Sequence, residues 1–384
     1  MRRSNSSNKP SICVVAHSAY GMLSGKSDGK VGGAERHASL IARWLAAHGW
    51  RVSMVTWDEY QPDGESVDGV QILKMCRRDQ GIRGLRFFYP RWTSLVRAMS
   101  SAQAELYFYN LGDLGLGQVV LWSRLNRAKS VYLVESEPDC DPAMPQLTKL
   151  RERLLYRIGL SRVDQIITQT KRQRQMLWSG FGLRSVIIPM PCDGPSEQQY
   201  IPPTFPGTRC VRILWVGRFS REKRLEWLLD VAERCPDWIF DVVGAAEVDS
   251  EYTAQLMQRA RRIPNVILHG KVQHREIGSF YRQAAALCCT SLFEGFPNTF
   301  LEAWSNGIPT VSTFDPDDLI ATHRLGGVAR DVSGLVAELH KLISSRECWE
   351  RVSANARRYY WENHRTDVVM PQFERVFLQV LGRT

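Results

Sequence analysis

The sequence predicts an α/β protein built from two doubly wound domains, and three observations lead to this prediction. The chain has 384 residues, which is longer than a single hydrophobic core usually extends. Short apolar strands alternate with helical segments, an order that produces parallel sheets from βαβ units. A proline-rich segment interrupts this alternation once, and the alternation then resumes. In such sheets ligands bind at the carboxyl ends of the strands, and a cleft between two domains is a common ligand site.

The first βαβ unit lies at the start of the chain. Ser11–Ala16 is an apolar strand, and a glycine-rich loop follows it. Residues 32–49 predict a helix, because apolar residues recur there at helical spacing and a glycine stands where a C-cap belongs. Further strands are predicted at Arg51–Trp57, Val70–Met75, Glu105–Tyr109, Ser130–Val134, Gln165–Thr168 and Ser185–Met190.

The interruption lies at Pro189–Gly207, which contains six prolines and no apolar periodicity. This composition is typical of an interdomain linker. We therefore predict an N-terminal domain over 10–190, a linker over 191–207, a C-terminal domain over 208–370 and a separate final helix over 371–384.

The same alternation restarts after the linker. Strands are predicted at Val211–Gly217, Trp238–Gly244, Asn265–Gly270, Ala286–Ser291 and Pro309–Thr313. The intervening helices are predicted at Glu222–Arg234, Ser250–Arg262, His274–Ala284 and Thr299–Asn306, and helices continue from about Ser333 to the end.

The formal net charge is +10, and two segments concentrate the positive charge. Ile82–Arg97 has four arginines, no acidic residue and four interleaved aromatic residues, and Leu147–Arg174 has eight basic residues against two acidic ones, a net charge of +6. Such mixtures suit an anionic membrane surface or a phosphorylated substrate. Solvated helix faces would have the same composition. Nucleic-acid binding would rest on charge alone, and no nucleic-acid partner is predicted.

The cellular location is predicted from what the sequence lacks. No apolar run follows the basic start before Pro10, so no secretory signal is expected. No stretch of about 18 uncharged apolar residues predicts a membrane span. The nine cysteines are scattered without a CxxC pair, which favours free thiols in a reducing cytoplasm. The basic aromatic segments extend this expectation to a peripheral position at the inner face of a membrane.

The most informative motif is Ser291–Gly307, SLFEGFPNTFLEAWSNG. It begins at the end of a strand, carries Glu294 in its loop, and opens a helix at Pro297–Thr299. Gly295 leaves a ligand free to approach the backbone, and the amides of a helix start bind anions. Glu302 lies one turn into the helix. Carboxylates beside an anion-binding turn suit a sugar phosphate. Alternatively, Thr299-x-x-Glu302 is a capping box, which would make Glu302 structural.

Two shorter motifs also lie between a strand and a helix. Gly217–Lys223, GRFSREK, supplies Arg218 and Lys223, two cations able to reach phosphates. Gly32-Gly33-Ala34-Glu35 opens the first helix and permits close approach of a phosphate or sugar. Taken alone, the first motif could be a loop with two surface cations, and the second could be a tight turn into a helix.

Together, in this order and spacing, the three motifs resemble the retaining glycosyltransferases of family 4, which have the GT-B fold of two Rossmann-like domains facing across a cleft. Glu294 and Glu302 form the family's Glu-x7-Glu pattern, in which Glu302 is the glutamate of Leu-Glu-Ala, and Gly-Ile-Pro-Thr-Val-Ser follows. GRFSREK resembles the Gly-Arg-x3-Glu-Lys stretch, and GGAE the N-terminal glycine loop. The resemblance spans nearly the whole chain and is strongest from Val211 to Thr313.

The resemblance implies an acceptor-side N-terminal domain, a nucleotide-sugar-binding C-terminal domain and a final helix that crosses back to the N-terminal domain. Arg218 and Lys223 would hold the donor diphosphate and stabilise it as the leaving group. Glu294 would face the transferred sugar, Glu302 the ribose, and the backbone near Val272 the base. The implied substrate-binding residues are Gly32, Gly33, Val272, Gly295, Phe296, Pro297, Asn298, Thr299 and Glu302.

The family's chemistry needs no carboxylate nucleophile, because the acceptor attacks on the face that the diphosphate leaves and the departing phosphate takes its proton. This separates it from hydrolases with paired carboxylates. No metal or other cofactor is predicted: Asp139-Cys-Asp141 and Asp315-Pro-Asp317 are chance-prone DxD matches. The implied acceptor is a lipid-linked glycan or a polysaccharide of the cell surface.

The sequence departs from the family at one position. The family usually has a histidine after the strand that corresponds to Ser130–Val134, but the sequence there is VESEPDCDP. Glu135 or Glu137 could take its place, the site could differ, or the chain could be an inactive homologue that binds a sugar nucleotide or acts as a scaffold. An epimerase or a phosphorylase on the same fold is a further alternative.

Overall fold

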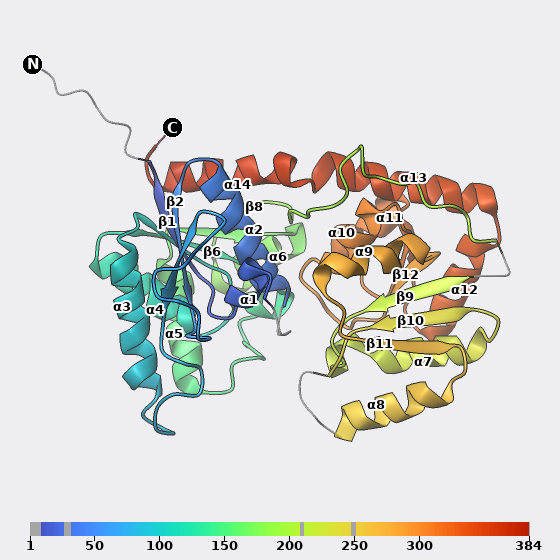
Figure 1. The fold of residues 1–384 in the computed structure, drawn as a ribbon, viewed down its shortest axis with the longest axis horizontal. Helices are drawn as coiled ribbons and strands as arrows, with labels where there is room; N and C mark the ends of the chain where they lie inside the picture. The colour runs from blue at the N-terminus through green and yellow to red at the C-terminus, as the bar shows by residue number, and fades with distance from the viewer. Residues whose placement is uncertain (1–8, 27–31, 208–210, 247–250, 384) are drawn as a thin grey trace, which may run out of the picture. The chain divides into compact units, whose positions relative to one another are not determined.

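The computed structural model describes residues 9–26, 32–207, 211–246 and 251–383. The chain divides into two compact units, with unit 1 formed by Met1–Ile188 and Met370–Thr384 and unit 2 by Pro189–Val369. Each unit contains one largely parallel sheet with helices on both faces (Figure 1). The predicted fold class of two doubly wound α/β domains is therefore confirmed.

The sheet of unit 1 has eight strands in the order β3-β4-β2-β1-β5-β6-β7-β8, all parallel except the β3–β4 pair. Most strands lie within a residue or two of their predicted positions, and the short β3 was not predicted. The strands are β1 (Ser11–Val15), β2 (Arg51–Thr56), β3 (Ser66–Val67), β4 (Val70–Lys74), β5 (Leu106–Tyr109), β6 (Lys129–Leu133), β7 (Gln165–Thr168) and β8 (Val186–Ile187).

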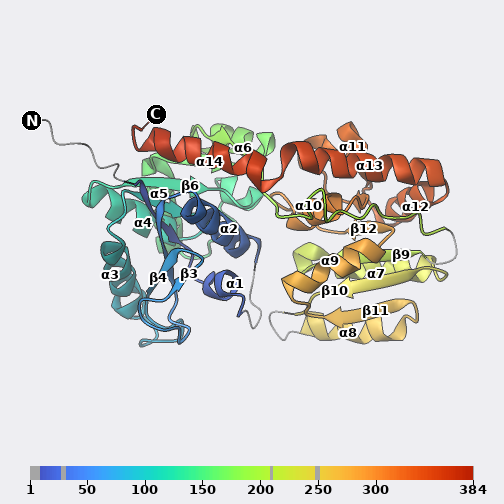
Figure 2. The ribbon, with the colours of Figure 1, turned by 45° about the horizontal axis from the view of Figure 1, so that its top comes forward.

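Helices cover both faces of this sheet. The helices α3, α4 and α5 lie over one face, while α2 and α14 lie over the other (Figure 1, Figure 2). The elements are α1 (Tyr20–Ser24), α2 (Gly33–Ala47), the π-helical turn η1 (Phe87–Trp92), α3 (Thr93–Ala102), α4 (Gly115–Leu125), η2 (Glu137–Cys140), α5 (Leu150–Arg162), α6 (Lys171–Phe181) and α14 (Thr366–Val380).

The last helix belongs to unit 1 from Met370 onward. Phe377 of α14 packs edge-on against Trp50 and Phe108, with ring centroids 6.2 and 5.9 Å apart. Trp50 Nε1 donates to Glu374 Oε1 at 2.8 Å. The C-terminal segment thus completes the core of a unit whose other residues come from the first half of the chain.

The sheet of unit 2 has six parallel strands in the order β11-β10-β9-β12-β13-β14. Five were predicted, and β14 was not, because three residues with two glycines carry almost no strand signal. The strands are β9 (Arg212–Val216), β10 (Ile239–Val243), β11 (Val266–Gly270), β12 (Ala286–Cys289), β13 (Thr310–Ser312) and β14 (Gly326–Val328).

The helices of unit 2 follow the alternation of the strands. The helices α7, α8 and α12 pack on one face of the sheet, while α9, α10, α11 and α13 pack on the other (Figure 1). The elements are the 3-10 turn η3 (Arg221–Lys223), α7 (Leu225–Arg234), α8 (Glu251–Arg262), α9 (His274–Gln283), α10 (Asn298–Ser305), η4 (Pro316–Asp318), α11 (Leu319–His323), α12 (Val332–Ile343) and α13 (Arg346–Asn363).

One predicted helix begins later than expected. The helix predicted from Glu222 is a 3-10 turn over Arg221–Lys223, and α7 starts only at Leu225. Arg224 separates them in a left-handed conformation with φ +47°, which no helix can include. This break places Lys223 in the loop rather than on the helix.

Candidate active site

The two motifs of unit 2 that are predicted to bind the donor converge at one edge of its sheet. The strands β9 and β12 are neighbours, and the strand order reverses between them, with β10 and β11 on one side and β13 and β14 on the other. Ligands bind at such a reversal point, outside the carboxyl ends of the strands. Gly217–Lys223 follows β9 and Glu294 follows β12, so both motifs lie at this point.

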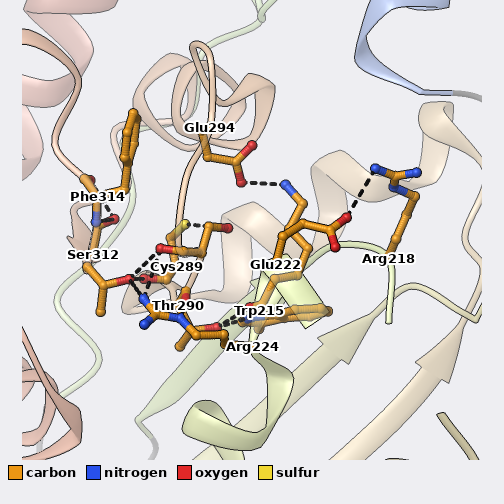
Figure 3. Close-up of polar contacts among 12 residues, drawn as sticks. Trp215, Arg218, Glu222, Arg224, Cys289, Thr290, Glu294, Ser312 and Phe314 are labelled. Atoms are coloured by element: carbon orange, nitrogen blue, oxygen red, sulfur yellow. Dashed lines mark hydrogen bonds and ion pairs between the residues drawn. The ribbon is translucent and has the colours of Figure 1, made fainter. Parts of the chain in front are cut away.

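The loop after β9 brings Lys223 to Glu294. Lys223 Nζ forms a short ion pair with Glu294 Oε1, and the two side chains are only 21% and 15% exposed. Arg218, which is about half exposed, lies 3.5 Å from the carboxylate of Glu222. Figure 3 shows Arg218, Glu222 and Glu294 gathered on one side of the site. A cation and a carboxylate side by side match a ligand in which a phosphate adjoins a sugar hydroxyl.

The loop after β12 is buried where it approaches α10. Gly295, Phe296 and Pro297 are buried, and Asn298 and Thr299 are partly exposed at the start of the helix. Pro297 is the N-cap, with no side chain capping the helix. The alternative that Thr299 begins a capping box is therefore wrong, and the first amides of α10 are left for another partner.

Glu302 lies in the first part of α10 and is 8% exposed. Its Oε2 accepts a 2.6 Å hydrogen bond from the hydroxyl of Tyr281 on α9, which orients the carboxylate. Val272, in the loop after β11, packs against the same hydrophobic cluster as Phe296 and Tyr281. Their contacts with ribose and base remain predictions.

Arg224 braces the two donor loops, a role that the sequence did not reveal. Its guanidinium donates to the carbonyl oxygens of Thr290 (2.7 Å) and Ser291 (3.0 Å) and to the hydroxyl of Thr313 (2.9 Å). Thr290 in turn donates to the carbonyl of Lys223 at 2.6 Å. Burial lowers the pKa of Arg224. The brace fixes the loop that carries Glu294 to the loop that carries Lys223 (Figure 3).

In unit 1 the glycine motif opens α2. Gly32 is its N-cap, and the Gly32 amide donates to Glu35 Oε2 at 3.0 Å. A side chain at Gly32 would meet that oxygen, because an added Cβ would lie 2.6 Å from it. Gly33 is exposed at the first position of the helix. The motif is thus a tight helix start with an accessible backbone. This geometry is compatible with a phosphate or sugar site and also with a simple turn into the helix.

Glu135 lies at the carboxyl end of β6, where three side chains hold its carboxylate. Asn110 Nδ2 donates to Oε1 at 2.6 Å, Gln169 Nε2 donates to Oε2 at 3.0 Å, and His37 Nδ1 lies 2.9 Å from Oε2. Asn110 also donates to the carbonyl of Ala34 at 2.7 Å. The three contacts fix the orientation of the carboxylate, and Asn110 ties it to the helix start that carries Gly33.

His37 is the residue that sequence reasoning missed. It lies on α2, is 2% exposed, and keeps its Nε2 buried without a hydrogen-bond partner in the described part of the chain. Because Nδ1 faces a carboxylate, Nδ1 carries the proton in the neutral ring. The histidine absent after β6 is thus matched by one that reaches Glu135 from another element.

Glu137 has different surroundings. Its carboxylate is 11% exposed and forms a 2.8 Å ion pair with Arg172, whose side chain is 66% exposed. Glu137 belongs to η2, in which burial raises the pKa of Asp139 to about 7. Of the two glutamates predicted at this end of unit 1, Glu135 is the one held by two amide side chains and a histidine.

Comparison with known proteins agrees with this arrangement. Residues 210–345 match the family model described as glycosyl transferases group 1, and residues 32–191 match the glycosyl transferase 4-like domain. The chain is a GT-B glycosyltransferase of the family 4 type. Among its relatives is the amylovoran biosynthesis glycosyltransferase AmsD of Erwinia amylovora, 22% identical over 347 residues that cover 86% of this chain and 91% of that protein.

Solved structures share the fold of this glycosyltransferase. Sucrose-phosphate synthase from Thermosynechococcus elongatus superposes with a TM-score of 0.77 at 17% identity, covering 97% of this chain and 100% of that one. Anabaena HepE, solved with UDP and glucose, superposes with a TM-score of 0.73 at 16% identity, covering 95% and 98%.

The two basic segments of the glycosyltransferase meet in unit 1. The guanidinium of Arg151 on α5 lies over the ring of Phe87 in η1, 4.6 Å from its centroid. Several large apolar side chains of these segments are exposed by more than half: Ile82, Leu85, Phe88, Tyr89, Leu150 and Leu154. Of the helices described, none is long and apolar enough to cross a membrane.

Carboxylates in the DxD matches of the enzyme have structural partners. Asp315 accepts hydrogen bonds from the amides of Ile320 and Ala321 at 2.8 and 3.1 Å. Asp139 accepts from the amide of Ser136 at 3.0 Å, and Asp141 from that of Ala143 at 2.8 Å. In the parts of the chain that the structure describes, no cluster of three or more metal-ligating side chains occurs.

Proposed function

We propose that the enzyme is a retaining glycosyltransferase that moves a sugar from a nucleoside-diphosphate sugar, bound by unit 2, to a glycan acceptor, bound by unit 1. The observation that carries the proposal is the Lys223–Glu294 pair at the point where the strand order of unit 2 reverses. The UDP in the solved HepE structure and the biosynthetic role in the name of AmsD support a nucleotide donor and a surface polysaccharide or glycolipid product.

The proposed chemistry depends on charge that develops at the diphosphate. As the glycosidic bond breaks, negative charge grows on the leaving group, and cations placed in advance stabilise that charge. Lys223 and Arg218 supply positive charge, and the amides at the start of α10 add dipoles. Glu294 accepts a hydroxyl of the transferred sugar. The acceptor oxygen attacks from the side that the diphosphate leaves, and its proton passes to the departing phosphate.

Glu135 serves the sugar and acceptor end of the reaction in this proposal. Its carboxylate already accepts hydrogen bonds from two amide side chains, so it is oriented before substrate binds. A carboxylate held in this way accepts a hydrogen bond from a substrate hydroxyl without reorganising. This supports an active enzyme over an inactive homologue, for which the missing histidine was the argument.

The membrane part of the proposal rests on the joined segments of unit 1. Exposed apolar side chains stand beside Arg83, Arg86 and Arg151, the composition of a surface that inserts into the headgroup layer of anionic lipids. We expect the protein to float with phosphatidylglycerol vesicles at low salt. A Phe88→Ser/Leu150→Ser variant should remain at the bottom of the gradient, and equal flotation of both would contradict this role.

The donor assignment is tested by thermal shift with a panel of nucleoside diphosphates and nucleotide sugars. A ligand of the folded state raises the melting temperature by mass action. We expect one base to stabilise the wild type and to lose its effect in Lys223→Ala. The matched control is Lys341→Ala, which removes an exposed lysine paired with Glu338.

Two outcomes are decisive. A shift with one nucleotide, together with formation of an α-linked product from an α-linked donor, supports the proposal. No shift with any nucleotide would contradict the donor site and would favour a repurposed fold. Nucleotide binding without sugar transfer to any acceptor would favour the inactive sugar-nucleotide-binding homologue.

A further inference from the structure

Unit 1 contains an open cavity of about 770 Å³, lined mainly by charged residues, that none of the predicted site residues lines. Four arginines surround it: Arg77 and Arg78 from the loop after β4, Arg86 just before η1, and Arg91 within η1. The cavity is large enough for a small ligand.

The four arginines outnumber the three acidic residues of the cavity lining. In the described residues, no ion pair joins Arg78, Arg86 or Arg91 to a carboxylate. Arg91 donates to the carbonyl of Arg78 at 2.7 Å and stacks over Trp57, while its Nε is buried without a partner. Burial lowers the pKa of Arg91, and the neighbouring Arg86 and Arg78 lower it further. Guanidinium groups held in this way favour an anionic ligand.

Three acidic residues also line the cavity, and one of them, Asp58, has a lysine partner. Asp58 lies 4.0 Å from Lys74 Nζ and accepts from the amide of Tyr60 at 3.0 Å. Burial raises the pKa of Glu59, although Arg78 opposes this. Asp79 is exposed. A cavity with arginines for an anion and carboxylates for hydroxyls matches a phosphorylated sugar better than a bare anion.

The cavity adjoins the exposed apolar loop of unit 1. Arg86 lines the cavity, and Ile82, Leu85, Phe88 and Tyr89, on either side of Arg86 in the chain, are 60–74% exposed. A ligand whose phosphate lies against the arginines can therefore extend an attached apolar chain over this loop. This continuity favours an amphiphile over a free phosphate.

The cavity also lies at the edge of the sheet that carries Glu135. It follows the carboxyl ends of β2 and β4, while Glu135 follows β6. Two strands, β1 and β5, separate β2 from β6, which corresponds to roughly 14 Å. The part of a ligand that lies in the cavity thus stays clear of the reacting hydroxyl, which is further along the acceptor, and contributes binding rather than chemistry.

We propose that this cavity binds the sugar-phosphate end of a lipid-linked acceptor, with the lipid chain lying over the Ile82–Tyr89 loop. The inference rests on the proposed function and names the acceptor class for it. Arg78 and Arg86 grip the phosphate oxygens, and the carboxylates of Asp58 and Glu59 accept hydroxyls of the attached sugar.

The test uses farnesyl diphosphate, farnesol and inorganic pyrophosphate as probes, with binding measured by calorimetry. All proteins carry Lys223→Ala, so that a diphosphate does not bind at the donor site. We expect farnesyl diphosphate to bind more tightly than the other two probes, and Arg78→Gln/Arg86→Gln to weaken it by about tenfold or more. The matched control is Arg83→Gln, an exposed arginine of the same loop that does not line the cavity.

The outcomes separate this inference from the proposed function. Equal binding to the double variant and to the Arg83→Gln control would overturn the site, as would absence of binding. Pyrophosphate binding as tightly as farnesyl diphosphate, with the same arginine dependence, would overturn the lipid source and assign the cavity to a soluble phosphate ester. The donor site is tested separately, by nucleotide thermal shifts of the Arg78→Gln/Arg86→Gln variant with Lys223 intact. A failure of the proposed function would appear in these shifts and not in the farnesyl diphosphate data.

Discussion

The two units hold their functional groups in different ways. In unit 2 the site is built from continuous motifs, and neighbouring loops are joined through main-chain carbonyls, as when Arg224 binds the carbonyls of Thr290 and Ser291. In unit 1 the carboxylate of Glu135 is held by single residues from three other places, Asn110 after β5, Gln169 after β7 and His37 on α2.

The difference reflects the tasks that we propose for the units. A diphosphate is the same in every nucleotide donor, and a fixed arrangement of cations and amides can bind it. An acceptor varies, and separate side chains on separate elements can change one at a time without altering the fold. Variation in unit 1 is therefore expected to change acceptor use without changing nucleotide binding, while loss of the unit 2 cations is expected to abolish nucleotide binding.

The largest effect that bears on this contrast is expected from Glu135→Gln. The amide keeps the shape of the side chain but loses the negative charge, and a hydrogen bond to a charged group contributes about 1.5 to 3 kcal/mol. We expect kcat/KM for sugar transfer to fall by about 10 to 10²-fold, with nucleotide thermal shifts unchanged. The measurement is initial-rate kinetics at a fixed donor concentration.

Glu137→Gln is the matched control for this prediction. Glu137 forms an ion pair with Arg172, whose side chain is mostly exposed. Exposed ion pairs contribute little to stability. We expect a change of about twofold at most. If the two variants behaved alike, the two glutamates would share one role, and the assignment of Glu135 would fail.

The contrast also explains what the sequence could predict. The donor motifs were visible because Gly217–Lys223 and Ser291–Gly307 are continuous and follow strands that apolar runs reveal. The partners of Glu135 were not visible, because His37 lies 98 residues away in the chain and Asn110 is 25 residues away. No local pattern links such residues.

Local conformation set a second limit. The start of α7 was predicted too early, because an arginine at φ +47° has no sequence signature and Glu222–Arg234 has a continuous helical pattern. The same residue, Arg224, braces the donor loops. The early start predicted for α7 and the missed role of Arg224 therefore have one cause. Tertiary hydrogen bonds hold Arg224 in a left-handed conformation that non-glycine residues disfavour.

A smaller effect is expected from Arg224→Lys, which tests whether the brace of unit 2 positions the donor loop. Lysine keeps the charge but cannot donate to Thr290, Ser291 and Thr313 together. We expect kcat to fall by up to about tenfold while the nucleotide still binds, because Lys223 and Arg218 remain. Single-turnover kinetics at saturating donor measure this. Loss of nucleotide binding together with activity would show instead that Arg224 only maintains the fold.

The smallest effect on activity, and the sharpest contrast between the units, is expected in how pH changes stability. In unit 1, burial raises the pKa of Asp139 from 3.8 to about 7. Between these two pKa values the carboxyl of Asp139 is ionised in the unfolded chain but protonated in the folded unit. The stability that protonated Asp139 contributes to the folded unit is therefore lost as pH rises from about 4 to about 7.

In unit 2 the sign is opposite. Burial lowers the pKa of His364 from 6.5 to about 4, although its hydrogen bond to the carbonyl of Met190 opposes this. The unfolded chain therefore binds a proton that the folded unit rejects, and stability is lost as pH falls from about 6.5 to about 4. Each pKa unit corresponds to about 1.4 kcal/mol.

Hydrogen exchange, corrected for its intrinsic pH dependence, should show amides of unit 1 better protected at pH 5 than at pH 7.5, and amides of unit 2 better protected at pH 7.5 than at pH 5. Asp139→Asn should flatten the first response and His364→Gln the second. Parallel responses of the two units, or unchanged slopes in the variants, would mean that other groups control the pH dependence of both.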